Sequence, residues 1–243
     1  AEPILSHVSL DVPQHGILGV QGPSGRGKST LLKLLMRYWD PQSGLVALSE
    51  VPLPQIDAHH RRRVQTMMGQ ETYLFDGTIR ENLLMACDMG GADTAGNAGD
   101  PDDSATSGRA LLTPPAPPVS WNAADSVLST RTPLSVGDDV LRAALAKASV
   151  LELVDSLPQG LDTPVGELGG RLSEGERQRI GLARVFLRNA SLVLFDEPTS
   201  RLDAYNESVI LQSIDALAQQ GGAVLLVSHR DSTMRIADRI VRM

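Results

Sequence analysis

Cysteine, aromatic residues and long apolar runs are all scarce in this chain of 243 residues. Its one cysteine, Cys87, excludes a disulfide framework within the chain and indicates a reducing compartment. No apolar stretch approaches the roughly 20 residues that cross a bilayer, so we expect no membrane span. The first residues lack the basic, apolar and small-residue pattern of a secretory signal. At this length the chain is able to bury a full core as one domain, or a core with a subdomain.

Positive charge is also in short supply. The chain has 22 Lys and Arg residues against 29 Asp and Glu residues, which gives a formal net charge of −7. Surfaces that bind nucleic acids usually carry a basic excess, so this balance argues against a general nucleic-acid surface. The one basic cluster, at 59–63, is predicted to be a solvated helix end.

Apolar patterns of two kinds alternate along most of the chain. Strands are predicted at 5–12, 17–21, 45–48, 64–68, 192–195 and 223–227, with another beginning at 240–241. Helices are predicted at 31–38, 140–153, 174–187 and 207–219 from apolar residues at three- and four-residue spacing. This alternation predicts an α/β layered domain, with 192–195 and 223–227 as central parallel strands. Since strand patterns reach both ends of the sequence, we expect it to be a fragment of a longer protein.

Residues 88–133 interrupt the pattern. They are rich in glycine and proline and have few aliphatic residues, a composition that buries too little apolar surface to order a chain. We predict a disordered insertion that expands a surface loop. A segment around Trp121 that binds a partner is the weaker alternative.

The sequence GPSGRGKST at 22–30 follows an apolar strand, opens a helix and fits G-x-x-x-x-G-K-[ST]. The predicted phosphate-binding residues are Gly22, Pro23, Ser24, Gly25, Arg26, Gly27, Lys28, Ser29 and Thr30. The glycines permit backbone N–H groups to converge on the β- and γ-phosphates, and the helix adds its positive end. Lys28 is predicted to reach the phosphates and Ser29 to ligate Mg²⁺. The alternative, a chance glycine-rich turn, is disfavoured by the flanking strand and helix.

Polar side chains follow two other buried strands. Asp196 and Glu197 end the first, where ligands bind in open α/β sheets. We predict that Asp196 holds Mg²⁺ together with Ser29, and that Glu197 polarises a water for attack on the γ-phosphate. His229 ends the second strand and is predicted to bond the γ-phosphate or that water. A strand-end histidine alone would more often be structural.

The segment LSEGE at 172–176 precedes a predicted helix. Ser173 and Glu176 have the spacing of a capping box, which is a purely structural explanation for both residues. Capping does not explain Gly175, because glycine in the first turn costs roughly 0.5–1 kcal/mol relative to alanine. We therefore expect something to approach the backbone closely at Gly175.

In this order the motifs resemble the nucleotide-binding domain of an ATP-binding cassette (ABC) transporter, over almost the whole chain. The resemblance implies a Walker A loop at 22–30, a Q-loop with Gln70, a signature at 172–176, a Walker B strand at 192–196, a D-loop at 200–203 and a switch histidine at His229. It also implies a fold: a RecA-like P-loop NTPase core of parallel strands, with an antiparallel β edge and an α-helical subdomain. The core would be 1–71 and 172–243, and the helical subdomain 72–171.

The resemblance further implies ATP and Mg²⁺ as ligands. It adds Gln70, Ser173 and Gly175 to the nucleotide site, and it makes Ser29, Gln70 and Asp196 the metal site. In this family two cassettes pair head to tail, so that the signature of one closes over the ATP on the phosphate loop of the other. The implied partners are thus a second nucleotide-binding domain, identical or different, and a transmembrane domain at the cytoplasmic face of a membrane.

Three segments resemble exporter-type cassettes, in which the membrane domain is usually fused upstream. These segments are 73–82, 157–160 together with 165–167, and 229–230 followed by 237–238. In that group 70–75 and Glu167 would touch the coupling helices of the membrane domain. The transported substrate stays open, since it contacts the membrane domain.

The chain departs from the family pattern at three places. Glu174 and Glu176 replace the glycine and glutamine of the usual signature, and Arg201 replaces a small residue of the D-loop. No aromatic residue precedes Tyr38, so the aromatic residue that stacks on adenine in this family is missing from the sequence. We nevertheless predict an active site, because Ser173 and Gly175 remain.

Two other readings share these motifs. One is a soluble ABC ATPase of DNA maintenance or translation, which the net charge and the absence of heptad repeats disfavour. The other is the separate ATPase subunit of an ABC importer, which the exporter-like segments disfavour. About six apolar spans encoded upstream would favour the exporter over both.

Overall fold

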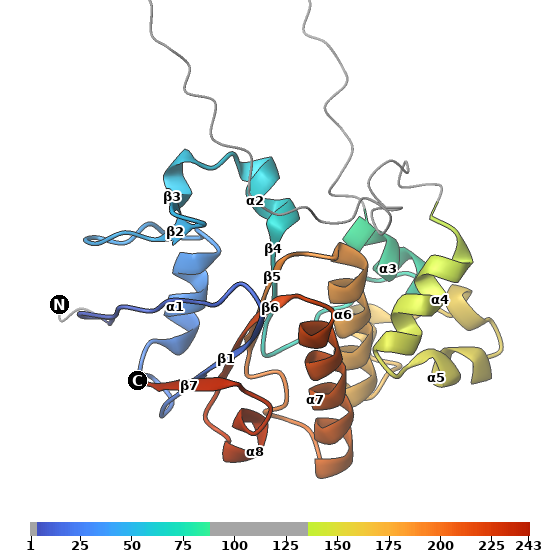
Figure 1. Ribbon diagram of the computed structural model, residues 1–243. Helices are drawn as coiled ribbons and strands as arrows, with labels where there is room; N and C mark the ends of the chain where they lie inside the picture. Colours follow the sequence, from blue (N-terminus) through green and yellow to red (C-terminus); the bar gives the residue numbers. More distant parts are fainter. Residues whose placement is uncertain (1–3, 88–135) are drawn as a thin grey trace, which may run out of the picture.

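The computed structural model describes residues 4–87 and 136–243, and the predicted insertion at 88–133 lies outside the described residues. A five-stranded parallel sheet forms the centre of the molecule (Figure 1). In spatial order its strands are β4 (Gln65–Met68), β5 (Leu192–Asp196), β6 (Ala223–Ser228), β1 (Gly16–Gln21) and β7 (Arg239–Arg242).

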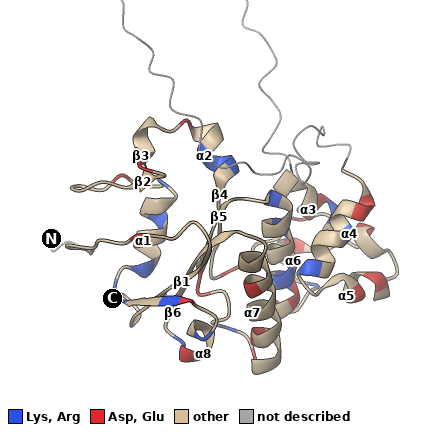
Figure 2. Ribbon diagram, viewed as in Figure 1, with Lys and Arg blue, Asp and Glu red and all other residues tan. Residues whose placement is uncertain are grey.

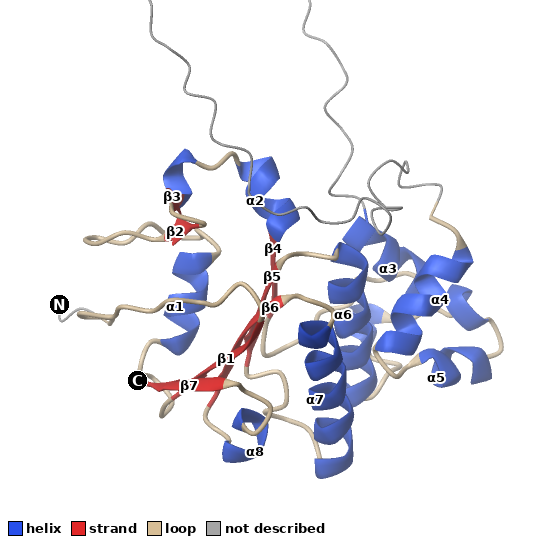
Figure 3. Cartoon of the chain, in the orientation of Figure 1, coloured by secondary structure: helices blue, strands red, loops and turns tan. Residues whose placement is uncertain are grey.

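Alternate residues of the central strands enter two separate apolar clusters, one on each face of the sheet. Val193 and Phe195 of β5 belong to one cluster, and Leu192 and Leu194 belong to the other. Helix α1 (Lys28–Leu35) places Leu32 in the second cluster, whereas α6 (Glu174–Arg188) and α7 (Ala204–Gln219) supply the first. The sheet is therefore covered on both faces, which is why its middle strands read as continuous apolar runs (Figure 3).

The strands that carry the polar residues are in register at their carboxyl ends. Gln21 of β1 pairs with Ser228 of β6, and Asp196 of β5 pairs with Val227. Three strands thus end at the same level of the sheet. The residues that follow them converge at that edge, as in other open α/β sheets.

The predicted strands are confirmed, except that one is absent and one is shorter than predicted. The strand prediction at 5–12 is wrong: these residues are irregular and mostly exposed. Apolar alternation alone favours a strand, but backbone pairing needs a partner, and in the described part of the chain no strand pairs with this segment. The prediction at 45–48 is reduced to β2 (Ala47–Leu48), which forms a two-stranded antiparallel sheet with β3 (Val51–Pro52).

The predicted helix at 140–153 is divided in the structure. It forms α4 (Asp138–Lys147) and α5 (Leu151–Ser156), because Ser149 has a left-handed φ of 55° that breaks the helix. The remaining helices are α2 (Ala58–Val64), α3 (Ile79–Cys87) and α8 (Asp231–Met234), with 3₁₀ turns at Leu53–Gln55, Gly160–Asp162 and Glu167–Gly169.

The helices α3, α4 and α5 extend the core beyond the sheet. Helices α3 and α4 pack against α6, and α5 packs against α4. The buried apolar side chains of all three helices belong to the same cluster as one face of the sheet. The basic cluster at 59–63 lies in α2, none of whose residues is buried, as expected for a solvated helix (Figure 2). None of the described helices is long and apolar enough to span a bilayer.

Candidate active site

The loop between β1 and α1 has the backbone that its glycines predict, at two of three positions. Gly25 and Gly27 have φ values of 82° and 87°, which favour glycine. Gly22 has no positive φ. A Cβ atom there would lie 2.7 Å from the backbone oxygen of Met243, so close approach and not dihedral freedom requires glycine at that position. The loop residues from Pro23 to Arg26 are exposed, as a ligand-binding loop requires.

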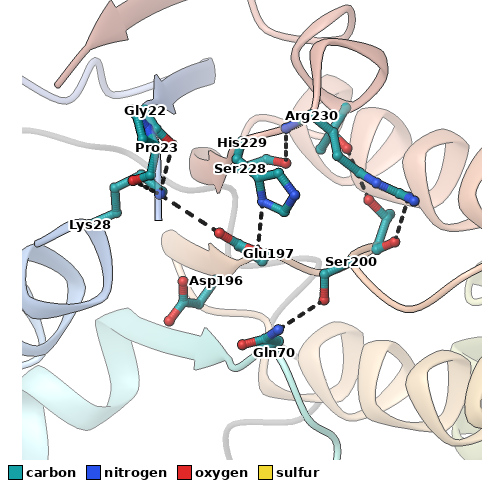
Figure 4. Close-up of polar contacts among 12 residues, drawn as sticks. Gly22, Pro23, Lys28, Gln70, Asp196, Glu197, Ser200, Ser228, His229 and Arg230 are labelled. Carbon is teal, nitrogen blue, oxygen red and sulfur yellow. Dashed lines mark hydrogen bonds and ion pairs between the residues drawn. The ribbon is translucent and has the colours of Figure 1, made fainter. Parts of the chain in front are cut away.

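Lys28 turns its ammonium group toward this loop. Its Nζ donates to the carbonyl oxygens of Gly22 and Pro23, each at 2.8 Å (Figure 4). The same Nζ lies 3.8 Å from Oε1 of Glu197, and the Lys28 side chain is only 4% exposed. A buried positive charge thus stands at the mouth of the loop, where a polyphosphate would bind.

Ser29 and Asp196 lie together although 167 positions separate them. The Ser29 hydroxyl donates to Oδ1 of Asp196 at 3.1 Å. Asp196 is only 8% exposed, and burial raises the pKa of its carboxyl, an effect that the Ser29 hydrogen bond opposes. Burial therefore makes its negative charge costly unless a cation lies beside it.

The donor set fits Mg²⁺. A hydroxyl and a carboxylate supply two hard oxygen ligands, and Mg²⁺ commonly takes one or two such ligands together with phosphate and water. Among the described residues no group of three or more His, Cys, Asp or Glu side chains could hold a metal ion. The protein thus offers part of a magnesium shell, of the kind that a bound phosphate completes.

Glu197 and His229 face each other from adjacent strands. His229 Nδ1 lies 3.0 Å from Oε2 of Glu197 (Figure 4). The Glu197 side chain is 15% exposed and that of His229 is 43% exposed, so the carboxylate lies deeper. Glu197 also has a φ of 49°, rare for a residue with a side chain, while its N–H donates to the carbonyl of Val227 at 2.9 Å. Such backbone strain clusters at functional sites.

Gln70 lies near this group but not in the predicted place. Its Nε2 donates to the Ser200 hydroxyl at 3.2 Å (Figure 4). Among the described residues no hydrogen bond joins it to Ser29 or Asp196. The structure therefore brings two of the three predicted metal ligands together, and it turns the third toward the loop after β5.

The signature residues form the predicted capping box at the start of α6. The Ser173 hydroxyl accepts from the backbone N–H of Glu176, and the Glu176 carboxylate accepts from that of Ser173 at 2.7 Å. Glu174 pairs with Arg177 at 2.5 Å, so its charge is offset within the helix. For the part of the chain that the structure describes, no hydrogen bond or ion pair links Ser173 or Gly175 to the phosphate loop.

The expectation of a close approach at Gly175 is confirmed. A Cβ atom there would lie 2.8 Å from Oδ1 of Asn206, in the first turn of α7. Arg179 donates to the same oxygen at 2.8 Å, which fixes the Asn206 side chain against α6. The glycine is thus explained by a neighbour within the chain.

Sequence reasoning missed a polar network around Arg230, the residue after His229. Arg230 donates to the carbonyl of Thr199 at 2.8 Å and to the Glu207 carboxylate at 2.9 Å (Figure 4). The hydroxyls of Ser232 and Thr233 also donate to Glu207. No motif marks Glu207, because its partners lie 23 to 26 positions further along the chain.

A cavity of about 470 Å³ opens between the phosphate loop and His229. Its lining consists of Gln21, Gly22, Pro23, Ser24, His229, Arg242 and Met243. Arg242 was not among the predicted site residues, since nothing in its sequence context connects the last strand with the phosphate loop.

A covered parallel sheet with a phosphate loop after one strand and an acidic pair after another defines a P-loop nucleotide hydrolase. The family within that class follows from a match of the ABC transporter family to residues 5–200. The chain therefore belongs to the ABC transporter family and is its ATP-binding domain, a class of ATPase.

Curated relatives and a solved structure agree with this assignment. The chain is 40% identical over 240 residues to a probable ABC transporter ATP-binding/permease protein of Haemophilus influenzae, covering 99% of this chain and 35% of that protein. It is 35% identical over 238 residues to ABC transporter ATM1 of Toxoplasma gondii, and this match covers 98% of this chain and 17% of that protein.

The solved structure of a bacterial Atm1-family ABC exporter with ATP bound has a TM-score of 0.69 and 28% identity, covering 94% of this chain and 32% of that one. The resemblance to the nucleotide-binding domains of exporter-type cassettes is thus confirmed. The chain spans about a third or less of the length of these relatives.

Proposed function

We propose that this chain hydrolyses ATP to power an export-type membrane domain. The observation that carries the proposal is the meeting of Lys28, Glu197 and His229 at one edge of the sheet, beside the pair of Ser29 and Asp196. These groups supply a cation for phosphate, a carboxylate for water and ligands for a metal ion. The similarity to an ABC exporter with ATP bound supports the same reading.

In this proposal each side chain has a separate task. Lys28 exchanges the loop carbonyls for β- and γ-phosphate oxygens, and the loop N–H groups bind the remaining oxygens. The Glu197 carboxylate orients a water in line with the γ-phosphate and accepts its proton. The ring N–H of His229 would bond either the Glu197 carboxylate, which Nδ1 contacts in this structure, or the γ-phosphate once ATP is bound.

Ser29 and Asp196 would hold Mg²⁺, with Gln70 turning from Ser200 to join them. The ion would offset negative charge on the phosphates. The raised pKa of the Asp196 carboxyl supports this role, since a cation relieves the cost of ionising a buried acid.

The site is completed by a second cassette in a head-to-tail dimer. The Ser173 hydroxyl and the backbone of Gly175 would meet the ATP held by the partner's phosphate loop. Because the Ser173 oxygen accepts from Glu176, its hydrogen is left to donate to a phosphate. The ion pair of Glu174 with Arg177 supports an active signature, since it offsets the added negative charge.

The membrane domain would dock on the exposed apolar residues near Gln70. Tyr73 and Phe75 are each 59% exposed, and Leu168, next to Glu167, is 63% exposed. Large exposed apolar side chains of this kind mark interaction surfaces. The helices of 72–171 would act as the subdomain that carries this surface, at the cytoplasmic face of the membrane.

Replacement of Glu197 by glutamine tests the proposal. The full-length gene product carrying Glu197→Gln should retain ATP and lose steady-state turnover by at least about a hundredfold, because the amide accepts no proton. Glu152→Gln, which alters an exposed carboxylate on α5, is the matched control and should hydrolyse ATP at the wild-type rate. Turnover that survives Glu197→Gln would remove Glu197 from the mechanism.

The hydropathy of the complete gene product tests the export assignment. About six apolar spans of bilayer length upstream of this chain are expected for an exporter with a fused membrane domain. A gene product with none would favour an importer subunit or a soluble ATPase.

A further inference from the structure

Two consecutive residues after β4 contact two consecutive residues after β5. Gln70 donates to Ser200, and the Arg201 guanidinium lies 2.5 Å from Oε1 of Glu71. The Tyr73 hydroxyl donates to the other oxygen of Glu71. Glu71 therefore anchors the loop of Gln70 to Arg201.

The opposite end of the same segment contacts the signature helix. Asp203 accepts from the backbone N–H of Asn206 at 3.0 Å and from its side-chain amide at 2.7 Å. The Asn206 oxygen accepts from Arg179 of α6 and lies against Gly175. Asn206 is therefore held by both helices and sets the distance between the signature turn and α7.

The residues between these two ends are fixed to the core. Leu202 is only 7% exposed, and its N–H donates to the carbonyl of Thr199 at 3.2 Å. Thr199 is fully buried, shares a hydrogen bond of 2.9 Å with Thr233 and accepts from Arg230 at its carbonyl. Because hydrogen bonds and burial fix the middle of the segment to the core, the distance between Arg201 and Asn206 is also fixed.

We propose that residues 200–206 form a bridge between Gln70 and the signature turn, with Arg201 and Asn206 as its positioning residues. The inference rests on the proposed ATPase function, since both ends of the bridge act on bound ATP. Arg201 works through Glu71 on Gln70, and Asn206 works through the backbone at Gly175. Neither side chain contacts the phosphate loop in the described part of the chain. The bridge should therefore affect the rate of ATP hydrolysis and not the binding of ATP.

Removal of Arg201 tests the first end. In the full-length gene product, Arg201→Ala should lower kcat for ATP hydrolysis about two- to fivefold, the range of an exposed ion pair, with KM for ATP changed by less than about twofold. Exchange of the two charges, Arg201→Glu with Glu71→Arg, should restore most of the loss. Arg201→Gln keeps a long polar side chain but removes the charge, so it should lower kcat in the same way and is the second variant if Arg201→Ala folds poorly.

A double-mutant cycle tests whether the two ends belong to one bridge. Asn206→Ala should also lower kcat, and the double variant with Arg201→Ala should lose less than the product of the two single losses. Independent effects that multiply fully would overturn the bridge. An unchanged kcat in Arg201→Ala, or a change confined to KM, would overturn it as well.

The matched control is Arg142→Ala. It breaks an ion pair of 2.7 Å with Asp155 in which the side chains are 42% and 41% exposed, against 51% and 38% for Arg201 and Glu71. Its kcat should equal the wild-type value. A wild-type protein without ATPase activity would refute the proposed function, whereas an active wild type with an equally active Arg201→Ala refutes only the bridge.

Discussion

At the scale of single residues, Glu174 is the departure from the family pattern whose effect on turnover is easiest to test. It stands where the family resemblance implies glycine, at the start of α6, and its carboxylate pairs with Arg177. Arg177 also donates to the carbonyl of Leu172 at 2.9 Å, so the ion pair lies along the first turn of its own helix. An acidic residue in a first turn also favours the helix dipole.

We therefore expect Glu174→Gly to change ATP turnover of the full-length protein by less than about threefold, because the removed charge is already offset. The same change should lower the free energy of unfolding by about 1 kcal/mol, through the lost dipole interaction and the added flexibility. Steady-state hydrolysis and denaturant unfolding measure the two effects, with Glu174→Gln as the control that keeps the side chain. A gain in turnover above about tenfold would show that the native signature is impaired.

Asp196 gives a prediction about pH. Burial raises the pKa of its carboxyl above the unfolded value, so the folded state favours the protonated form. Its contribution to stability is fully present below the unfolded pKa and is lost as pH rises through the raised folded pKa. Without Mg²⁺, the melting temperature should therefore fall over this interval more steeply in wild type than in Asp196→Asn.

Differential scanning fluorimetry between the unfolded and the folded pKa of Asp196, with and without Mg²⁺ and ATP, compares the melting temperatures of the two proteins. Added Mg²⁺ and ATP should raise the melting temperature of the wild type at neutral pH more than that of Asp196→Asn, which keeps Lys28 and the phosphate loop but lacks the metal-binding carboxylate. Parallel pH profiles of the two proteins would contradict the assignment of the buried charge to Asp196.

At the scale of helices and strands, most of the predictions that rest on the spacing of apolar residues are confirmed. The strand at 192–195, its neighbour at 223–227 and the helix at 174–187 all form nearly as expected, because their apolar residues face a core. The wrong strand prediction at 5–12 and the break after α4 have other causes. Residues 5–12 lack a strand partner in the described part of the chain, and the break follows from the φ of Ser149, and apolar spacing encodes neither.

The turn between α4 and α5 gives a test at this scale. Ser149 is exposed and has a φ of 55°, which costs a residue with a side chain about 1–2 kcal/mol. Ser149→Gly should therefore raise the free energy of unfolding by about 0.5 kcal/mol after the entropy of glycine is counted. Ser149→Val should lower it by about 1 kcal/mol or more, since a β-branched side chain fits this conformation poorly. Urea unfolding of both variants measures the pair, and equal shifts of the same sign would contradict the explanation.

The site was predicted best where a local motif names it and least where distant segments meet. Lys28, Ser29, Asp196, Glu197 and His229 are brought together as their motifs imply. Gln70 bonds Ser200 because contacts between two loops decide its direction. Glu207 was not predicted, since its role comes from partners in α8 and the preceding turn.

At the scale of the whole molecule, one apolar cluster runs from the sheet through α6 into α3, α4 and α5. The strands of that sheet also carry the second cluster, which includes Leu32 of α1. A ligand that binds the phosphate loop should therefore stabilise the entire described fold and not only the loop. At a free ATP concentration of one hundred times Kd, the expected gain is about 2.7 kcal/mol.

Lys28→Ala should abolish the ATP-dependent rise in melting temperature, because the buried ammonium group provides the charge that faces the phosphates. Lys147→Ala, at the end of α4, should keep the full rise. A thermal-shift titration with ATP compares the variants. An undiminished shift in Lys28→Ala would place ATP elsewhere on the protein.

Strands β1, β5 and β6 are paired in register, so the number of residues in each strand decides how far along the sheet the residues after it lie. Gln21 pairs with Ser228, and Asp196 with Val227, so the groups that follow are aligned by the number of residues in each strand. One residue inserted into β6 would carry His229 about 3.3 Å along the sheet and turn it toward the opposite face. The three strands should therefore tolerate apolar substitutions of similar size but not changes in length, and natural insertions and deletions should be confined to the connecting segments.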